Sequence, residues 1–261
     1  MIYETILFEK VDGVSTITLN RPESLNAINF EMAQELLRAT KECEGKEVRA
    51  VVIRGSGRAF CAGGDVKAMR ETLPRQGEFL RRTAGILHEL ILALRALKKP
   101  VIASISGPAA GAGFSLALAC DLRIASEKTS FNTAYVRIGL SPDGSGTYFL
   151  PKYVGLGKAC ELFFLGNTID AKEAERLGLV NKVVPEDDLE STTMELARRL
   201  AEGPTLAIGQ TKLLIDLSFT EALGSQLDKE LENLVRCSET QDFVEGISAF
   251  FEKRRPTFQG M

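Results

Sequence analysis

Two loops built almost entirely of small residues are the segments of this chain best suited to chemistry. They span residues 58–67 (RAFCAGGDVK) and 107–113 (GPAAGAG). Each follows a β-branched run and precedes a predicted helix, so bare backbone N–H groups would lie at a helix N-terminus. Such amides can hold negative charge on a ligand or a transition state. Each loop by itself is equally typical of a helix packed tightly on a sheet.

Together the two loops predict more than either does alone, because one amide from each could point at a single oxygen. An oxyanion hole needs two such donors about 3 Å from the oxygen, and each can lower the barrier by roughly 3 kcal/mol. The sequence offers one further acid–base candidate, Asp143 in SPDGSGT. From the residues alone, this Pro-Asp-Gly is more typical of a turn.

Two other polar residues give weaker signals. His88 is the only histidine and lies on a predicted long helix, where a packing or surface histidine is the usual interpretation. Ser115 lies in GFSLA, which is not the G-x-S-x-G of a serine hydrolase. Gly111-Ala112-Gly113 is likewise not the G-x-G-x-x-G of a dinucleotide-binding fold, because position 116 is leucine.

Alternating strands and helices would position these loops. The first loop follows a predicted strand at 48–54, and the second follows one at 101–105. This alternation predicts an α/β fold with mainly parallel strands. The pattern of apolar residues predicts further strands at 3–9, 14–20, 122–125 and 180–184. It predicts helices at 30–43, 78–98 and 114–119 and from 189 onward, and a capping box at 170–173 opens a further short helix. The segment 129–138 is predicted to be extended, and the segment 139–147 to be irregular.

The overall composition bounds the class of protein. The chain has 261 residues, enough for one large domain or for one domain with a smaller helical appendage. Its net charge of −3 predicts neither nucleic acid nor an anionic membrane as a partner. The five cysteines are odd in number and have no C-x-x-C spacing, which predicts reduced thiols in the cytoplasm and no zinc site. No apolar run reaches the about 18 residues of a membrane helix, and the N-terminus lacks a signal-peptide pattern.

Six segments in sequence order carry a family resemblance. They are LNRPESLNAI, RAFCAGGDVKAM, SGPAAGAGFSLALACDLRIAS, TAYVRIGLSPDGSGTYFLPKYVG, DAKEAERLGLVNKVVP and GISAFFEKRRPTF. Together they span nearly the whole chain and resemble the signatures of the enoyl-CoA hydratase/isomerase (crotonase) family. In its motifs the chain is most similar to the isomerase branch related to phenylacetate degradation.

The resemblance implies a crotonase (ClpP-like) spiral of β-β-α turns, with a core at 1–195 and a C-terminal helical region at 196–261 that builds homotrimers or homohexamers. The ligand would be an acyl-CoA thioester, with CoA as part of the substrate and no separate cofactor or metal. Its carbonyl would lie between the amides of Gly64 and Ala112, and the reaction would pass through an enolate-like anion. CoA contacts would come from Leu25, Ala27, Ala62, Gly64, Asp65, Val66, Lys67 and Lys253. On its own, Lys253 is more typical of a solvated residue that compensates a helix dipole.

The sequence departs from the family's hydratases at two positions. Where those enzymes carry glutamates that hold and activate water, this chain has Ser115 and Tyr135. Neither side chain can act as a carboxylate base, and hydration needs proton movement at both carbons of the double bond. The departure therefore argues against simple hydratase activity.

Asp143 resembles the acid–base residue of the isomerase branch, whose members carry a similar V-x-I-G-L-x-P-D motif. One carboxylate near both C2 and C4 can take a proton from one carbon and return it to the other. An apolar pocket of Leu140, Tyr148 and Phe149 would strengthen it as a base. The predicted function is therefore an enoyl-CoA double-bond isomerase with Asp143 as the proton shuttle.

Three alternatives stay open at this point. One is an enoyl-CoA hydratase in which Tyr135 or Ser115 positions water, and another is an acyl-CoA-binding family member with little activity. The third is the dehalogenase branch, which pairs an aspartate with a histidine on the helix of His88 but also uses a tryptophan, and this chain has none. The acyl group of the substrate depends on how residues 69–82 fold over the pocket.

Overall fold

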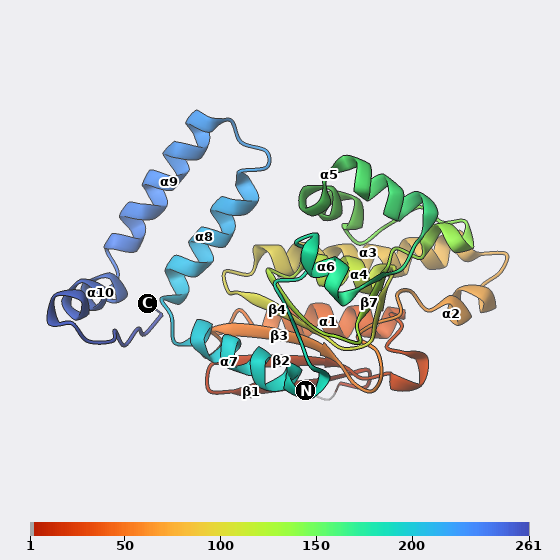
Figure 1. The fold of residues 1–261 in the computed structure, drawn as a ribbon, viewed down its shortest axis with the longest axis horizontal. Coiled ribbons are helices and arrows are strands. Elements are labelled where there is room, and N and C mark those ends of the chain that lie inside the picture. The colour runs from red at the N-terminus through yellow and green to blue at the C-terminus, as the bar shows by residue number, and fades with distance from the viewer. Residues whose placement is uncertain (1–2, 261) are drawn as a thin grey trace.

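A six-stranded sheet forms the centre of the computed structural model, which describes residues 3–260 (Figure 1). The strands lie in the order β1, β2, β3, β4, β6, β9; β1 runs antiparallel to β2, and every other neighbouring pair is parallel. The strands are β1 (Ile6–Val11), β2 (Val14–Leu19), β3 (Ala50–Gly55), β4 (Val101–Ile105), β6 (Leu122–Ser126) and β9 (Lys182–Val184). The predicted hairpin and the mainly parallel sheet are confirmed.

A second, three-stranded sheet lies beside the first and was not predicted. Its strands are β5 (Pro108–Ala110), β7 (Ser130–Asn132) and β8 (Ile169–Asp170), with β5 parallel and β8 antiparallel to β7. Strands of two or three residues are too short to give a period-2 pattern. The segment predicted as extended at 129–138 was wrong in its second half, because the 3₁₀ turn η2 (Tyr135–Ile138) follows β7.

Helices connect the strands and cover both faces of the larger sheet. They are α1 (Phe30–Glu42), α2 (Val66–Glu71), α3 (Gln76–Ala96), α4 (Ala112–Ala119), α5 (Gly146–Leu165), α6 (Ala171–Arg176), α7 (Leu189–Ala201), α8 (Thr205–Leu217), α9 (Leu223–Ser238) and α10 (Gln241–Glu252), with short 3₁₀ turns η1 (Pro22–Ser24) and η3 (Glu186–Asp188). Successive residues of a strand face opposite sides. Val51 of β3 therefore packs in the main core under α1 and α3, whereas Val52 packs with Ala197 of α7 on the other face.

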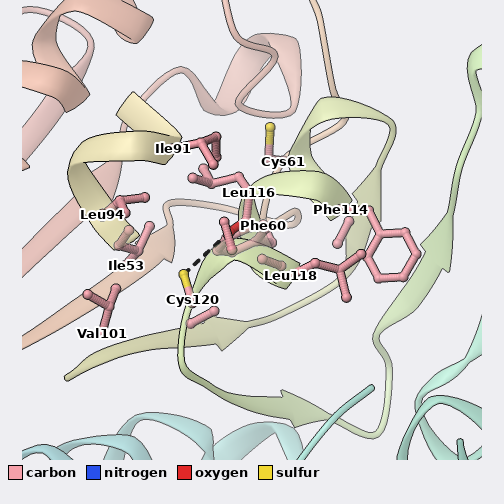
Figure 2. Packing of buried hydrophobic residues seen from close by; sticks show 14 of the residues in the cluster. Ile53, Phe60, Cys61, Ile91, Leu94, Val101, Phe114, Leu116, Leu118 and Cys120 are labelled. Carbon is pink, nitrogen blue, oxygen red and sulfur yellow. Dashed lines mark hydrogen bonds between the residues drawn. The ribbon is translucent and has the colours of Figure 1, made fainter. Parts of the chain in front are cut away.

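The helix that follows the second small-residue loop is buried on every side. All residues of α4 are buried, as its uniformly apolar sequence predicted. Figure 2 shows Leu116 and Leu118 of this helix packed among side chains from β3, β4 and α3. At its end the Sγ of Cys120 donates a hydrogen bond to the carbonyl of Leu116 over 3.4 Å (dashed in Figure 2). Because α4 is enclosed in this way, the peptide at its N-terminus has a fixed position.

The sequence did not predict helix α5, because the segment contains residues that disfavour a helix. The segment contains Pro151 and a non-helical Gly155 with φ +77°, so the chain kinks within the helix. The predicted capping box, in contrast, is confirmed: Asp170 accepts a hydrogen bond from the Glu173 amide at the start of α6. Asp65 and Thr240 form the equivalent caps of α2 and α10. Local capping chemistry is therefore readable from the sequence, whereas a helix that tolerates proline and glycine is not.

The last three helices, α8 to α10, extend away from the rest of the molecule (Figure 1). Buried Lys212 anchors α8, because its Nζ donates to Leu94 O over 2.7 Å and lies 2.9 Å from an Asp121 oxygen. The predicted division at 195/196 lies inside α7, which packs on the sheet as one unit. The separation into a core and a helical region remains a prediction. Among residues 3–260, no helix combines the length and the apolarity that a membrane crossing requires.

Candidate active site

The two small-residue loops lie side by side at the edge between the two sheets. Cys61 of the first loop forms a parallel bridge with Ala109 of the second. The amide of Ala110 donates to the Cys61 carbonyl over 2.9 Å, and the amide of Cys61 donates to the Pro108 carbonyl over 3.1 Å. The loops, about fifty residues apart in the sequence, are thus joined by backbone hydrogen bonds.

Glycine is required where the loops approach most closely. A Cβ at Gly63 would lie 2.9 Å from the carbonyl of Ala110, and one at Gly113 would lie 2.6 Å from the Cβ of Cys61. Gly111, which precedes α4, has φ +49° and ψ −123°, a conformation that side chains disfavour. Tight packing and exposed amides, the two interpretations of these loops, are therefore compatible, because the small residues let the loops pack closely and this packing brings their amides together.

Two backbone amides remain available where the loops meet. The neighbouring amides are used: Ala62 donates to Leu25 O over 2.9 Å, and Gly111 donates to Asn132 O over 2.9 Å. The hydrogen bonds found within residues 3–260 give no acceptor to the amides of Gly64 and Ala112. Ala112 is the first residue of α4, whose N–H has no partner within the helix. Both residues line the same cavity, so the two amides can serve one anionic oxygen.

The cavity beside these amides has a volume of about 400 Å³. Its walls are mostly apolar, as is typical of a small-molecule site. The segment at 69–82 covers one side of it, as expected. The side chains that line the cavity include Ile28, Val66, Met69, Phe79, Leu80, Ala84, Leu87, Ile138 and Leu140.

Asp143 lines this cavity and is held by two hydroxyl side chains. The phenol of Tyr135 donates to Asp143 Oδ1 over 2.7 Å. The hydroxyl of Ser115 donates to the carbonyl of Asp143 over 3.0 Å and lies 3.3 Å from the Tyr135 oxygen. The two positions at which the sequence departs from the family's hydratases are thus brought together around the predicted acid–base residue.

Tyr135 remains a neutral hydrogen-bond donor in this site. Burial raises the pKa of its phenol well above the ordinary value, and the negative charge of Asp143 raises it further. The phenol therefore donates to a carboxyl group at the wall of the same cavity that Gly64 and Ala112 line.

His88 also contacts this segment, which only the resemblance to the dehalogenase branch had indicated. Its side chain is exposed on α3, yet its Nε2 accepts a hydrogen bond from the amide of Gly144 over 3.4 Å. Helical spacing could not have revealed this contact, because Gly144 lies 56 residues further along the chain.

Of the three residues predicted to form an apolar pocket around Asp143, only one lines the cavity. Leu140 lines the cavity, but Tyr148 and Phe149 do not. Their rings surround the Lys152 ammonium, which lies 3.1 Å from the ring centroid of Tyr148 and 5.9 Å from that of Phe149. Both residues belong to the unpredicted helix α5, which turns them away from the site.

Three of the eight predicted CoA contacts line the cavity: Ala62, Gly64 and Val66. A fourth, Leu25, is joined to Ala62 by a backbone hydrogen bond. Sequence reasoning missed Arg21, whose guanidinium donates to Ala27 O over 2.6 Å and to Asp65 Oδ2 over 2.9 Å. Arg21 thereby ties the segment after β2 to the start of α2, and its only sequence signal was its place in LNRPESLNAI.

The two predicted CoA lysines lie in different parts of the molecule. Lys67 is exposed on α2 and lines a second, polar cavity of about 380 Å³ together with Arg21 and Arg82. Lys253 ends α10, which lies at the opposite end of the molecule from α2 (Figure 1). The chain therefore does not bring its own Lys253 to its own cavity.

Known proteins resemble this chain over its whole length. The profile of the enoyl-CoA hydratase/isomerase family matches residues 9–261. The chain is 39% identical over 263 residues to a Rhodobacter capsulatus protein named "Probable enoyl-CoA hydratase", with 100% of both chains covered. It is 38% identical to the 1,2-epoxyphenylacetyl-CoA isomerase of Escherichia coli, covering 98% of this chain and 99% of that one. Among solved structures, an enoyl-CoA hydratase from Bacillus anthracis matches with a TM-score of 0.94 at 32% identity, covering 99% of this chain and 100% of the other.

Family profile, full-length similarity and fold agree with one another. The crotonase fold implied by the motifs is confirmed by the neighbouring structures. The names of the relatives include both hydratases and isomerases, so the similarities establish the family and not which of the two reactions is catalysed. The chain belongs to the enoyl-CoA hydratase/isomerase family.

Proposed function

We propose that this protein is an enoyl-CoA double-bond isomerase in which Asp143 moves the proton. The thioester oxygen accepts hydrogen bonds from the amides of Gly64 and Ala112. The Asp143 carboxylate takes a proton from C2, the C2–H electrons pass into the thioester as an enolate, and the two amides stabilise the charge on its oxygen. The protonated Asp143 then delivers the same proton to C4, which restores both the thioester and the carboxylate.

A single observation carries this proposal. Among the described residues that line the cavity, Asp143 is the only carboxylate, and it lines the same cavity as both free amides. Isomerisation needs one group that acts first as base and then as acid, whereas hydration needs groups that activate water and protonate carbon. The cavity chemistry therefore matches isomerisation better than hydration.

A hydratase is the second candidate, because the Rhodobacter capsulatus relative is named as one. In that case the hydroxyl groups of Ser115 and Tyr135, which lie 3.3 Å apart, would hold the attacking water. A family member that binds acyl-CoA with little turnover is the third outcome. All three share the same ligand and differ only in what the enzyme does to it.

The deciding experiment compares Asp143→Asn with the wild-type protein on 3-enoyl-CoA and 2-enoyl-CoA esters. We expect the wild type to convert 3-enoyl-CoA to the conjugated isomer, and the variant to lose about 10²- to 10⁴-fold in rate, the usual contribution of a positioned acid–base group. Binding of the CoA ester, measured by calorimetry, should stay nearly unchanged. Isomerase activity of the variant near the wild-type level would overturn the mechanism. Water addition without isomerisation would favour the hydratase, and tight binding without turnover would favour the binding protein.

CoA itself would be held by residues that follow β2 and by residues of the first small-residue loop and the start of α2: Leu25, Ala27, Ala62, Gly64, Asp65, Val66 and Lys67. No cofactor beyond the CoA of the substrate is needed for this chemistry. Because Lys253 lies away from the cavity of its own chain, we infer that any contact it makes with CoA is with a molecule bound to another protomer.

A homotrimer, alone or paired as a homohexamer, is the assembly that we propose. Leu227, Leu231 and Leu234 form a row on α9 at helical spacing and are 53%, 61% and 68% exposed. Phe250 and Phe251 on α10 are also largely exposed. Apolar side chains in such a row are typical of a protein–protein contact. The family resemblance supplies the partner, a second copy of this chain.

A further inference from the structure

The peptide between Asp143 and Gly144 is held on both of its polar atoms by side chains from elsewhere in the fold. Its carbonyl accepts from Ser115 of α4 over 3.0 Å, and its N–H donates to Nε2 of His88 on α3 over 3.4 Å. The phenol of Tyr135, from η2, holds the Asp143 side chain at Oδ1 over 2.7 Å. Side chains from two elements thus hold the peptide, and a side chain from a third holds the Asp143 carboxyl group.

We propose that Ser115, Tyr135 and His88 together form a clamp that positions Asp143, leaving Oδ2 as the oxygen that exchanges the proton with the substrate. Within residues 3–260, Asp143 Oδ2 has no hydrogen-bond partner, whereas Oδ1 has one. The inference rests on the proposed isomerase function. It assigns positioning roles to three residues, of which Tyr135 also lines the cavity.

Positioning has a physical purpose in this reaction. One carboxylate must reach two carbons of the substrate in turn, so a shift of the loop would favour one transfer and impair the other. A displacement of about 1 Å at a reacting group can cost about 100-fold in rate. The turn at 143–146 needs support because Ser145 has φ +74°, a strained conformation for a residue with a side chain.

Each of the three clamp residues has the hydrogen-bonding group that its position requires. Because Tyr135 keeps its proton, it donates to the carboxylate throughout the working pH range. Ser115 is buried and has the carbonyl of Asp143 as acceptor. His88 Nε2 accepts a hydrogen bond from the Gly144 amide, a role that a glutamine oxygen could also fill and leucine could not.

The test uses substitutions that remove one hydrogen bond at a time. Tyr135→Phe should lower kcat by about 10- to 100-fold with little change in KM, as expected for the loss of one hydrogen bond to a charged group. Tyr148→Phe is the matched control, since it removes an exposed phenol outside the cavity and should leave kcat and KM unchanged.

The His88 contact is tested by a pair of variants. His88→Leu should lower kcat, and His88→Gln should restore most of it. Deuterium exchange of the peptide covering residues 140–148 gives a readout that does not depend on activity. We expect faster exchange in Tyr135→Phe and His88→Leu than in the wild type and in His88→Gln.

The outcomes separate the clamp from the proposed function. A kcat and an exchange rate equal to those of the wild type in both Tyr135→Phe and His88→Leu would overturn the clamp even if the enzyme is an isomerase. If the wild type does not isomerise any 3-enoyl-CoA, the proposed function fails, and faster exchange in the variants would still show that the three side chains hold Asp143.

Discussion

The packing of the two loops can be tested by adding one methyl group at Gly113. A Cβ there would lie 2.6 Å from the Cβ of Cys61 and would also meet the Cys61 carbonyl. Both atoms belong to the enclosed first loop, so neither can rotate away. Overpacking of this kind costs about 1–3 kcal/mol in stability. The loops must separate to admit the methyl group, and the Gly64 and Ala112 amides would separate with them.

Gly85→Ala is the matched control for Gly113→Ala. Gly85 also lies within a helix, α3, but a Cβ there would meet no atom within 4 Å. Alanine should therefore stabilise the protein at position 85 by about 1 kcal/mol through helix propensity. The same propensity gain applies at both sites, so it cancels when the two variants are compared. Their difference in stability, about 1–3 kcal/mol, isolates the steric cost.

Two assays measure the result. Thermal unfolding should place Gly113→Ala below Gly85→Ala by about 2–4 °C for each kcal/mol of that difference. Turnover of the enoyl-CoA substrate should fall about 100-fold in Gly113→Ala, because a shift of about 1 Å in one amide has that effect, and should stay unchanged in Gly85→Ala. If both variants unfold at the same temperature and retain full activity, then close contact of the loops does not form the site.

Two further predictions concern other parts of the chain. Ser145→Gly should raise the stability by about 1 kcal/mol, because it relieves φ +74° and removes a buried hydroxyl that lacks a partner among the described residues; a lower unfolding temperature would contradict this. In light scattering, the wild-type protein should have the mass of three or six chains. Leu231→Glu on α9 should lower the measured mass, because it places a charge in the exposed apolar row. A monomeric wild type would refute the proposed oligomer.

Elements with strong local signals were predictable from the sequence. The β-branched runs that form β3 and β4 and the apolar spacing of α1 and α3 gave elements within a few residues of their observed bounds. The caps at Asp65, Asp170 and Thr240 depend on hydrogen bonds that span three residues, so their pattern is complete within a short window. The second sheet and α5 escaped prediction because two-residue strands, proline and glycine give no such pattern.

Some features of the candidate site were likewise predictable from local sequence, and others were not. The sequence by itself determined the family, the two small-residue loops and the candidate residue Asp143, because each of these is carried by contiguous motifs. The fold showed that Asp143 is the one carboxylate among the described residues that line the cavity. Only the tertiary structure decided that Tyr135, Ser115 and His88 meet at Asp143 and Gly144, across separations of 8, 28 and 56 residues. Contacts at such distances follow from how sheets and helices pack, and no local pattern of residues encodes that packing.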